Sequence, residues 1–588
     1  MRHAMPLHAQ HLRPRTVRPQ RLRRVLPPLA VGAFALWLYA STAAPWLTWA
    51  HDGADGGDLI AAAMTLGVPH PSGYPTYCLL ARLYALLPLG PIARRFNLFS
   101  ATSAAATVVL VYLAALWALE QSATRRAPWG AALGALAALA CASGYTLWSQ
   151  ATITEVYTLQ AFFFALSFYL ALREDWLLRA RTWAILGMSL GLGLGAHLAL
   201  LLALPGTALL LWPRASARRL LALAAGLGLG LSVYAYLPLA AGGHSPVVWG
   251  QPDTWAGFWW MVSGKLYRGY LLAVPLDGLP SRLAAWARLW GQQYTWPGLA
   301  LGLGGLYSWA AQGRRRWVWG TSITFLSYTL YALTYNTTDS YVYLIPAFLL
   351  AAVWLAEGAG VVLSAGARWA TRETQPPSRH QPGDSLARPH APPRLLSGPD
   401  YRRAGALEDE NGRGGRSYPE RACCARFRAS PTHNPQPVTR NLFALGLIIL
   451  ALIPAWSILA HYRALDLCAD GEVAEWVEDS LRQLPQAAVL ISSEDRHTFA
   501  LEYVQWVDGR RGDLLVADGE LLSQPWYVAQ LKRRLPGMGT LGGALSPAQF
   551  AAVLDPQHAL YLDSPREELA RHGPLVPRGP LWEVTAPR

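Results

Sequence analysis

Long runs of uncharged apolar residues separate nearly every polar segment of this chain, and they constrain its fold more than any other feature. Apolar residues make up 53% of the 588 positions and charged residues only 15%, which is typical of membrane proteins. A helix needs roughly 20 apolar residues to cross a bilayer, and tilt changes that number by a few. Eleven segments meet this requirement: 26–47, 97–119, 129–147, 150–172, 182–197, 198–212, 219–240, 297–311, 317–335, 341–364 and 441–461. We therefore expect an all-α polytopic membrane bundle.

The positive charge is concentrated in two segments rather than spread over one face. Of the formal net charge of +14, the first 24 residues contribute seven arginines and no acids, and residues 365–440 contribute thirteen arginines against seven acids. Basic segments that flank apolar spans are typical of cytoplasmic retention and of contact with anionic lipid. We therefore expect the lipid bilayer, and no nucleic acid, among the partners.

The arginines also predict the orientation of the spans. With a cytoplasmic N-terminus, the arginine-rich loops all face the cytoplasm, as the positive-inside rule requires. This assignment requires that 76–90 not cross the membrane, and Arg82 and Pro88 within it suit a helix lying in the interface. An odd number of spans then places the C-terminus outside, in a multi-pass protein of the cell membrane.

The expected domain organisation follows from these segments. A basic cytoplasmic leader (1–25) precedes a transmembrane domain (26–364), a disordered cytoplasmic loop (365–440), a last helix (441–461) and an external domain (462–588). In the external domain, short apolar runs alternate with helical segments, which predicts a small α/β domain. The expected strands are 487–492, 513–518 and 558–563, and the expected helices are 497–508 and 523–535.

The first external loop, residues 49–77, holds the densest group of polar side chains. Asp55 and Asp58 lie three positions apart, so a helix that begins at Asp55 would place both carboxylates on one face. Paired carboxylates at a membrane surface can act as a general base and as its orienting or metal-binding partner. Helix capping in a solvated acidic loop explains the same spacing equally well.

A stiff turn follows in the same loop. The segment from His70 to Pro75 contains two prolines and Gly73, so its backbone could present His70 and Tyr74 to a phosphate or a sugar. A membrane re-entry turn explains the prolines and the glycine as well. It does not explain the acidic pair that precedes them.

The whole block, DGGDLIAAAMTLGVPHPSGYPTY at 55–77, resembles the acidic motif and His-Pro-Pro-Gly-Tyr-Pro motif of a large, mostly bacterial membrane family. That family includes the animal transmembrane O-mannosyltransferases and belongs to the GT-C glycosyltransferase superfamily. Further motifs resemble it in the same order along most of the chain: RRFNLFSA, TEVYTLQ, YLPLA, VVWGQPDTWAGF, YNTTDSYVYLIP, SSEDRHTFALEYVQ and GRRGDLLV. The resemblance implies a GT-C-like fold of about eleven transmembrane helices, and sugar donors linked to polyprenyl phosphate.

The resemblance also implies roles for particular residues. Asp55 matches the catalytic Asp of the family motif, and Asp58 stands where Glu is usual. Ser72 replaces the usual second Pro. Val248 and Gln251 stand where an Asn-Trp-Gly-Asp-Pro block of the family has its Asn and its Asp, which removes polar and acidic groups and puts the role of that block in doubt.

Further candidates lie at the predicted external helix ends. Glu155 is an ionisable group near the bilayer and therefore a candidate for catalysis, although it could simply be solvated. Lys265 and Arg268 could bind a phosphate through charge-assisted hydrogen bonds, or could contact lipid headgroups.

The remaining substrate-binding candidates are His197, Trp249, Asn336 and Asp339. His197 would lie at the tip of a tight hairpin, where a structural role explains it as well. Trp249 could stack on a sugar or anchor the protein at the interface. Asn336 and Asp339 could line the site or cap a short turn.

We expect a hexosyltransferase that moves a mannose-like sugar from a polyprenyl-phosphate donor to a hydroxyl of a protein or glycan acceptor on the external face. Asp55 would act as general base, with Asp58 and Glu155 positioning the site. His70, Lys265 and Arg268 would stabilise the departing phosphate. A divalent metal is compatible with this chemistry but not required by it.

Two other classes of protein remain open. A lipid or solute transporter or flippase would also need many spans, but no inverted repeat and no charge in mid-helix is evident in the sequence. A non-catalytic assembly or sensor protein would bind through its external domain. The five cysteines suggest neither a disulfide framework nor a zinc site.

Overall fold

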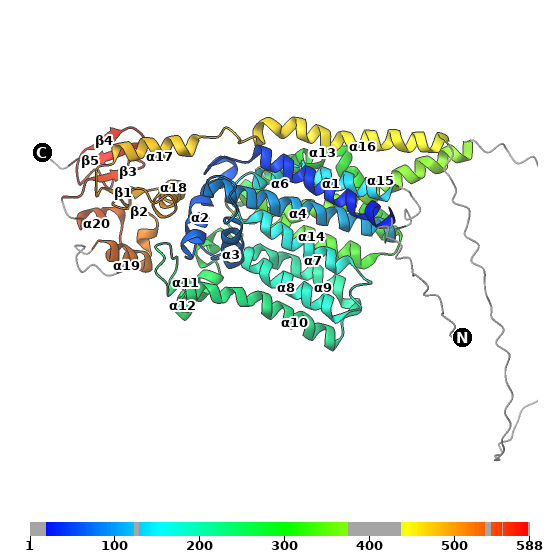
Figure 1. Ribbon diagram of the computed structural model, residues 1–588, viewed down its shortest axis with the longest axis horizontal. Coiled ribbons are helices and arrows are strands. Elements are labelled where there is room, and N and C mark those ends of the chain that lie inside the picture. Colours follow the sequence, from blue (N-terminus) through cyan, green and yellow to red (C-terminus); the bar gives the residue numbers. More distant parts are fainter. Residues whose placement is uncertain (1–18, 123–128, 374–436, 536–542, 555–556, 586–588) are drawn as a thin grey trace, which may run out of the picture. The chain divides into compact units, whose positions relative to one another are not determined.

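The computed structural model describes residues 19–122, 129–373, 437–535, 543–554 and 557–585, and it is mostly helical (Figure 1). The chain divides into two compact units, Met1–Ala365 with Ala444–Arg588, and Gly366–Phe443. The predicted leader, up to residue 18, and most of the predicted loop, residues 374–436, lie outside the described residues. Within the first unit, a helical bundle is followed by a small C-terminal domain that contains a sheet.

The bundle is built from long helices joined by short ones. The helices are α1 (Pro19–Thr42), α2 (Gly56–Thr65), α3 (Pro75–Tyr84), α4 (Ile92–Gln121), α5 (Gly130–Ala142), α6 (Tyr145–Ala151), α7 (Tyr157–Leu172), α8 (Ala180–Ala196), α9 (Leu204–Leu211), α10 (Ala217–Leu231), α11 (Tyr236–Ala241), α12 (Trp255–Val262), α13 (Leu279–Ala311), α14 (Arg315–Thr334), α15 (Ile345–Glu373) and α16 (Pro437–Leu465). Short 3-10 helices connect them: η1 (Ala50–Asp55), η3 (Leu198–Ala203), η4 (Trp212–Arg214), η5 (Ser232–Ala235), η6 (Lys265–Tyr270), η7 (Leu276–Gly278) and η8 (Ser340–Leu344).

Five stretches among the described residues are long and apolar enough to cross a membrane. They are Val25–Thr42, Ile92–Gln121, Ala217–Ala241, Ser340–Trp369 and Phe443–Leu465, and the pair α5 and α6, bent by 66°, could form a sixth. The chain is therefore a multi-pass membrane protein by length and composition. The larger number of eleven spans stays a prediction.

The predicted span at 150–172 does not begin where hydropathy placed it. The chain leaves α6 after Ala151 and enters α7 only at Tyr157. Between them, the carbonyl of Thr152 accepts a hydrogen bond from the backbone N–H of Ala44 (3.0 Å), and the Thr154 hydroxyl donates to the Asn97 side chain (2.6 Å). Polar partners on neighbouring segments thus permit an unwound segment inside a helical bundle, which a hydropathy window does not detect.

Close helix contacts in the bundle depend on small residues. A Cβ added to Gly187 of α8 would lie 2.1 Å from the carbonyl oxygen of Leu223 on α10, and one added to Gly226 would lie 2.0 Å from that of Ala184. Helices can approach this closely only where side chains are absent, as is common for membrane helices. The glycine-rich runs of α8 and α10 therefore fix this helix pair.

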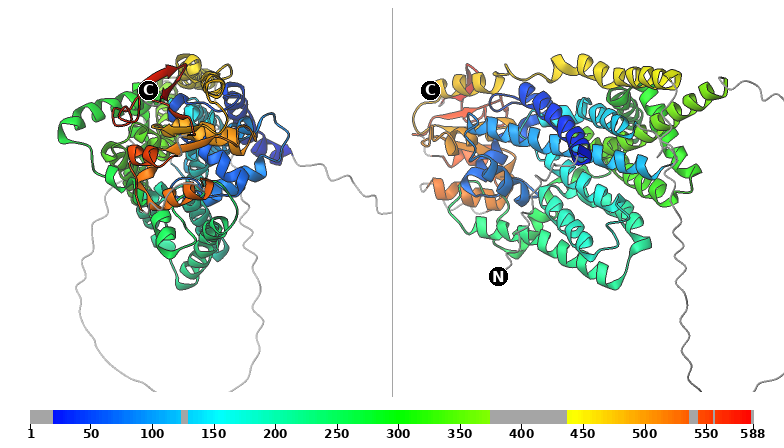
Figure 2. Two further views of the ribbon diagram at one scale, coloured as in Figure 1. Left: turned by 90° about the vertical axis from the view of Figure 1, so that its left-hand side faces the viewer. Right: turned by 45° about the vertical axis from the view of Figure 1, so that its right-hand side comes forward.

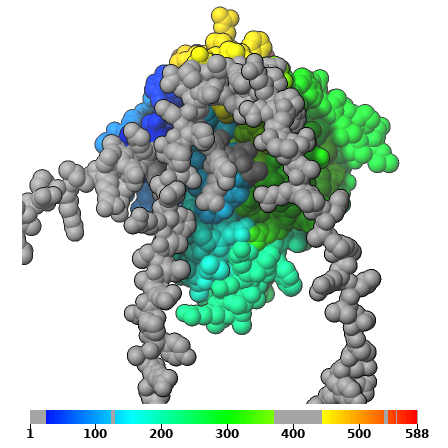
Figure 3. Space-filling view, turned by 90° about the vertical axis from the view of Figure 1, so that its right-hand side faces the viewer, coloured from blue at the N-terminus to red at the C-terminus, as the bar shows by residue number. Residues whose placement is uncertain are grey.

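Three predicted cytoplasmic loops meet at one end of the bundle. Glu174, after α7, accepts a hydrogen bond from Arg214 (2.7 Å), forms an ion pair with Arg316, and accepts one from the indole of Trp317 (3.2 Å). Figure 3 views the molecule from the right-hand side of Figure 1. The arginine loops at 173–181, 212–219 and 314–316 therefore lie together, as the predicted topology requires.

The C-terminal domain contains a five-stranded sheet flanked by helices. Its strands are β1 (Val489–Ser492), β2 (Leu515–Asp518), β3 (Leu560–Leu562), β4 (Leu575–Arg578) and β5 (Leu581–Val584), in the order β2-β1-β3-β5-β4. The first three are parallel, whereas β5 is antiparallel to both β3 and β4. The helices are α17 (Glu472–Gln483), α18 (Asp495–Trp506), α19 (Pro525–Arg534) and α20 (Pro547–Ala552), with the 3-10 helix η9 (Leu521–Ser523). The predicted fold class, a helical bundle with a small C-terminal α/β domain, is confirmed.

Helix α18 packs directly against α2 of the bundle (Figures 1 and 2). A Cβ added to Gly57 would lie 2.1 Å from the carbonyl oxygen of Phe499, so the two backbones touch at this position. Gly57 lies between the two acidic residues of the predicted site. The C-terminal domain therefore forms one wall of that site.

Candidate functional site

The acidic pair lies at the start of α2. Asp55 occupies the position before the helix, but its side chain forms no capping hydrogen bond. Its carboxylate instead faces the Nε2 atom of His70 at 3.3 Å, and 36% of its side-chain surface is exposed. The predicted start of a helix at Asp55 is therefore confirmed. The Asp55 side chain, however, does not cap this helix.

Asp58, one turn further along α2, is fully buried. Its carboxylate accepts three hydrogen bonds: from His70 Nδ1 (2.6 Å), from the His70 backbone N–H (2.9 Å) and from the indole of Trp249 (3.2 Å). A buried carboxylate with this many donors is held in one position. Asp58 thus fixes the orientation of His70 and Trp249 and leaves Asp55 as the exposed member of the pair.

His70 lies between the two carboxylates, so both of its ring nitrogens face an acceptor. Burial lowers its pKa, but the charge of Asp55 and the hydrogen bond and charge of Asp58 outweigh burial and raise the pKa to about 9. Burial raises the pKa of Asp55, and the charge of His70 opposes that rise. At neutral pH, His70 is therefore an imidazolium held between its two partners.

Aromatic rings enclose His70. Phe499 of α18 stacks parallel to it with centroids 6.3 Å apart, and Tyr74 contacts it edge-on at 5.0 Å. Tyr267 of η6 lies at 6.4 Å. The aromatic wall excludes water from three sides of the imidazole, so the ion pair with Asp55 is screened less than one on the surface.

A second aromatic group surrounds His197. Tyr74 stacks on its ring at 5.8 Å, and Tyr157 lies at 5.4 Å. His197 Nδ1 accepts a hydrogen bond from the Ala199 backbone N–H (3.0 Å), and Tyr157 donates to the carboxylate of Asp339 (3.1 Å). His197 and Tyr74 are therefore structural supports for the site in this arrangement, and their predicted contact with substrate stays a prediction.

Glu155 lies between α6 and α7 and is 2% exposed. The Val156 backbone N–H donates to its carboxylate (3.3 Å), and its carbonyl oxygen accepts from Ser100 (3.3 Å). Asp55 and Asp339 are the charged groups that act most strongly on it. The structure thus brings Asp55, Glu155 and Asp339 into one acidic region.

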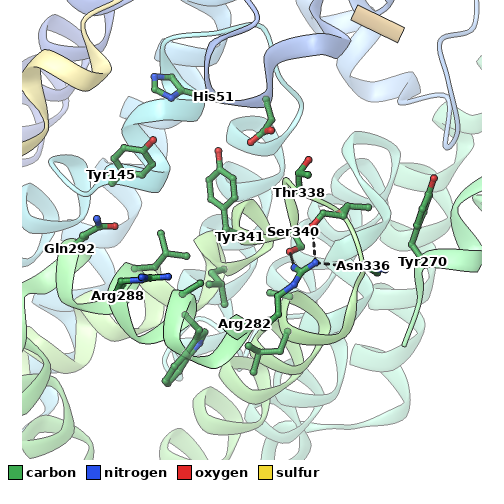
Figure 4. A pocket seen from close by; sticks show the side chains of 18 of the residues that line it. His51, Tyr145, Tyr270, Arg282, Arg288, Gln292, Asn336, Thr338, Ser340 and Tyr341 are labelled. Carbon is green, nitrogen blue, oxygen red and sulfur yellow. Dashed lines mark hydrogen bonds between the residues drawn. The ribbon is translucent and has the colours of Figure 1, made fainter. Parts of the chain in front are cut away.

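A cavity of about 1100 Å³ begins beside this region (Figure 4). Its wall includes His51 and Asp52 of η1, both held with left-handed backbone angles (φ 59° and 62°), and Tyr341 beside Asp339. Burial raises the pKa of Asp52, whereas a hydrogen bond from Tyr341 lowers it. Asp52, which lines the cavity, precedes Asp55 by three positions in the chain.

Two arginines of α13 line the same cavity. Arg282 donates to the Thr337 carbonyl (3.1 Å) and to the Asn336 side chain (3.4 Å), and it also bonds Ser340. Arg288 points into the cavity further along α13 (Figure 4). Neither arginine forms a salt bridge with a carboxylate in the described part of the chain. The two guanidinium groups therefore make the cavity suitable for an anion.

Several buried polar atoms of this cavity have no hydrogen-bond partner among the described residues. They are His51 Nε2, Trp286 Nε1 and Thr337 Oγ1. Buried donors and acceptors without a partner are costly unless a ligand or water satisfies them. The cavity is thus suited to a ligand with many hydroxyl groups as well as to an anion.

Lys265 and Arg268, which the sequence predicts to bind phosphate, do not line the arginine cavity. Both line a separate cleft of about 660 Å³, together with Trp259, Trp260 and Trp526. Only Tyr267, between them in the chain, reaches His70. The structure thus separates Lys265 and Arg268 from the cavity that contains Asn336, and a role for them in binding the donor phosphate stays a prediction.

No group of three or more His, Cys, Asp or Glu side chains is arranged to hold a metal ion in the described ranges. Asp55 and Asp58 both face His70 rather than a shared empty position. The acidic pair therefore does not fit a metal between its two carboxylates.

The sequence did not single out several residues of the site, namely His51, Tyr267, Arg282, Arg288, Asp495 and Phe499. Asp495 opens α18; burial and the charge of Asp55 raise its pKa. A signal for the α18 residues was present, because they lie in the SSEDRHTFALEYVQ motif. No such signal marked the arginines of α13, which lie outside every quoted motif.

These features define a polytopic membrane protein with a carboxylate–histidine–carboxylate array beside a cavity lined by cations. Residues 55–233 match the family model described as Protein O-mannosyl-transferase TMEM260 N-terminal domain, and residues 474–555 match TMEM260-associated domain 2. The family resemblance predicted from the motifs is therefore confirmed.

The proteins similar to the chain include a mouse protein and two crystal structures. Mouse Protein O-mannosyl-transferase TMEM260 is 25% identical over 519 residues, which cover 84% of this chain and 63% of the mouse protein. The chain thus spans less than two thirds of that relative's length. Two crystal structures of ArnT from Cupriavidus metallidurans, one bound to undecaprenyl phosphate and one in the apo state, are 12% identical with TM-scores of 0.47 and 0.44. Each match covers 96% of this chain, and 98% and 99% of the respective ArnT chain.

Proposed function

We propose that the protein is a membrane glycosyltransferase that moves a mannose-like hexose from a polyprenyl-phosphate donor to a hydroxyl group of a protein acceptor. The observation that carries this proposal is the half-buried carboxylate of Asp55, which keeps part of its surface accessible. It is oriented by the buried His70–Asp58 pair, and Asp52, three residues earlier in the chain, lines a cavity with two arginines. The match to models of an O-mannosyltransferase family supports the same reaction class.

The reaction needs one base and no acid. Asp55 takes the proton of the acceptor hydroxyl while the oxygen of that hydroxyl attacks the anomeric carbon of the sugar. The bond from the anomeric carbon to the phosphate oxygen breaks, and the polyprenyl phosphate leaves with its electron pair. Attack from the face opposite the leaving group inverts the anomeric centre. Because a phosphate leaves as an anion, it needs no proton from the enzyme.

Arg282 and Arg288 would bind the donor phosphate. Charge accumulates on the phosphate oxygens as the sugar departs, and fixed guanidinium groups in a protected cavity stabilise that charge. Arg288 also lines a neighbouring cavity of about 440 Å³ with Trp296 and Trp456, on helices α13 and α16. This second cavity would accommodate the first part of the polyprenyl chain.

His70 would act by positioning rather than by transferring the proton. Its imidazolium holds one carboxylate oxygen of Asp55 and leaves the other oxygen free for the acceptor. The charge of Asp339 adds to the effect of burial in raising the pKa of Asp55, which favours the proton transfer to Asp55.

The site would face the outside of the cell membrane, with the N-terminus in the cytoplasm and the C-terminal domain outside. The meeting of the arginine loops around Glu174 at one end of the bundle supports this orientation under the positive-inside rule.

The test is to incubate the purified full chain with a panel of polyprenyl-phosphate sugars and serine- or threonine-containing peptides, and to identify the product by mass spectrometry. We expect a peptide that gains one hexose from the mannose donor, at a rate that falls in Arg282→Ala and Arg288→Ala. Arg315→Ala, outside the cavity lining, is the matched control. Donor that crosses a vesicle membrane without transfer would instead indicate a flippase.

A further inference from the structure

The cleft that holds Lys265 and Arg268 lies next to the acidic site but is separate from the arginine-lined cavity. Its first wall is the segment from Gly250 to Arg268, and its second wall is the start of α19 in the C-terminal domain, Gln524 to Trp526. The cleft therefore exists only where the two domains of the chain meet.

The first wall is tied to the catalytic loop by backbone contacts. Val68, two residues before His70, donates to the Val247 carbonyl (2.8 Å), and its own carbonyl accepts from the Trp249 N–H (3.0 Å). The indole of Trp249 donates to Asp58 and packs on Trp526 at 5.8 Å. One layer of side chains thus separates the cleft from Asp58 and His70.

The second wall is held against the first. The Gln530 side chain of α19 donates to the Val248 carbonyl, and Trp260 packs on Trp526 with centroids 5.9 Å apart. The Trp526 indole N–H is buried and has no partner among the described residues. The walls are therefore fixed to each other, with one donor left to be satisfied by water or by a ligand.

The lining of the cleft combines positive charge with aromatic surface. Lys265 and Arg268 are both exposed, and neither forms a salt bridge within the described ranges; Arg268 donates only to the Ser263 carbonyl (3.4 Å). Trp259 is 50% exposed beside them. Unpaired cations next to exposed indoles favour a ligand that carries both negative charge and apolar or planar groups.

A reaction between two substrates needs a second binding region near the base. The arginine-lined cavity lies on the Asp52 and Asp339 side of the acidic site, whereas this cleft lies on the Trp249 and Tyr267 side. We propose that the cleft binds the acceptor, and that this acceptor is an acidic segment of a protein. The role of this segment as the acceptor rests on the proposed function, whereas its binding to the cleft does not.

The cleft itself favours a polypeptide over a lipid headgroup. Gln251, Thr254, Ser263 and Gln524 line it, so hydrogen-bonding side chains lie on both walls. One wall belongs to the C-terminal α/β domain, in which the described helices are shorter and more polar than the candidate membrane spans of the bundle. An extended chain between these walls can bond the polar groups on both of them. Tyr267, between Lys265 and Arg268 in the chain, lies beside His70 and connects this cleft to the acidic site.

Binding can be measured without any donor. Fluorescence anisotropy of a labelled peptide, with one threonine flanked by aspartates and glutamates, is recorded with the purified full chain in a neutral detergent. We expect the double reversal Lys265→Glu with Arg268→Glu to weaken binding about tenfold. One exposed ion pair changes affinity by roughly 1.4- to 5-fold, and two such pairs are lost in this variant. A peptide with lysines in place of the acids should bind the reversed variant better than the wild type.

One further variant serves as a control and another as a second test of the cleft. Arg533→Glu reverses an exposed cation of α19 outside the cleft and should leave peptide affinity unchanged. Trp259→Ala should weaken both the acidic and the lysine-containing peptide, because it removes aromatic contact rather than charge.

Three results would overturn the proposal. They are equal affinity of the wild type for acidic and basic peptides, a charge-reversal effect that appears only in vesicles containing anionic lipid, and a loss of polyprenyl-phosphate affinity in the reversed variant. Absence of hexose transfer with normal peptide binding would instead contradict the proposed function and leave the cleft assignment standing.

Discussion

At the scale of single residues, His70 determines how the two motif carboxylates differ. Asp58 is fully buried and bonds three donors, whereas Asp55 keeps one partner and an exposed face. The two acids have the same side chain and lie in the same turn of helix. Their different surroundings, rather than their chemistry, make one a positioning group and leave the other free to accept a proton.

This arrangement predicts how stability depends on pH. The pKa of His70 is raised from 6.5 to about 9 in the folded protein, so its contribution to stability is fully present below about pH 6.5 and is lost as pH rises through about 9. We expect the melting temperature of the wild type to fall between pH 7 and pH 10 more steeply than that of His70→Gln. Differential scanning fluorimetry in detergent measures both.

The exposed His244 provides a control, because His244→Gln should follow the wild-type curve. Parallel curves for His70→Gln and the wild type across this range would show that His70 is not charged in the folded protein.

Part of this site could be predicted from the sequence. Asp55, Asp58 and His70 lie within sixteen consecutive positions of one loop, and a helix start at Asp55 was enough to place the carboxylates together. Phe499 and Arg282 are hundreds of positions away, and only tertiary packing brings them to the site. The charge of Lys265 and Arg268 makes them candidates for binding an anion, but charge alone does not predict the cleft that they line.

At the scale of secondary-structure elements, the contact between α2 and α18 is decided by one glycine. A Cβ at Gly57 would lie 2.1 Å from the Phe499 carbonyl oxygen, whereas a Cβ at the neighbouring Gly56 would lie 3.4 Å from the Thr154 side chain, an ordinary contact. We expect Gly57→Ala to cost about 1–3 kcal/mol, as overpacking does, and to lower transfer by displacing Phe499 from His70.

Gly56→Ala is the matched control for this substitution, since it gains the same helix propensity without the backbone clash. Thermal denaturation and peptide transfer should separate the two variants. Equal stability and activity of both would mean that α18 does not press against α2 at this position.

In the C-terminal domain, the sequence predicts the strands that are buried apolar runs but not the strands that are open to solvent. The predicted strands match β1, β2 and β3 because those are buried apolar runs. Strands β4 and β5 were missed, because β4 is largely open to solvent and contains Pro577, which gives it no buried apolar pattern. Helix lengths in the bundle were misjudged where the chain unwinds, as at 152–156, because hydropathy does not report hydrogen bonds between segments.

At the scale of the whole molecule, the proposed reaction requires that the catalytic loop and the C-terminal domain lie on the same side of the membrane. Reporter fusions after Arg316 and within 365–440 should report the cytoplasm, whereas fusions after Tyr270 and at the C-terminus should report the outside. The physical reason is the clustering of the arginine loops around Glu174. Alkaline phosphatase and green fluorescent protein fusions give complementary signals, and a cytoplasmic C-terminus would contradict this topology.

If Asp55 is the base of the sugar transfer, its substitution by Asn should abolish the chemical step, which single-turnover transfer by Asp55→Asn measures. Asn keeps the size of the side chain but cannot accept the acceptor's proton, and loss of a general base typically costs about 10² to 10⁴ in rate. We predict that loss, with donor affinity close to that of the wild type, because the donor phosphate would bind Arg282 and Arg288 instead. Transfer by Asp55→Asn at a rate near the wild type would contradict the assignment of Asp55 as the base.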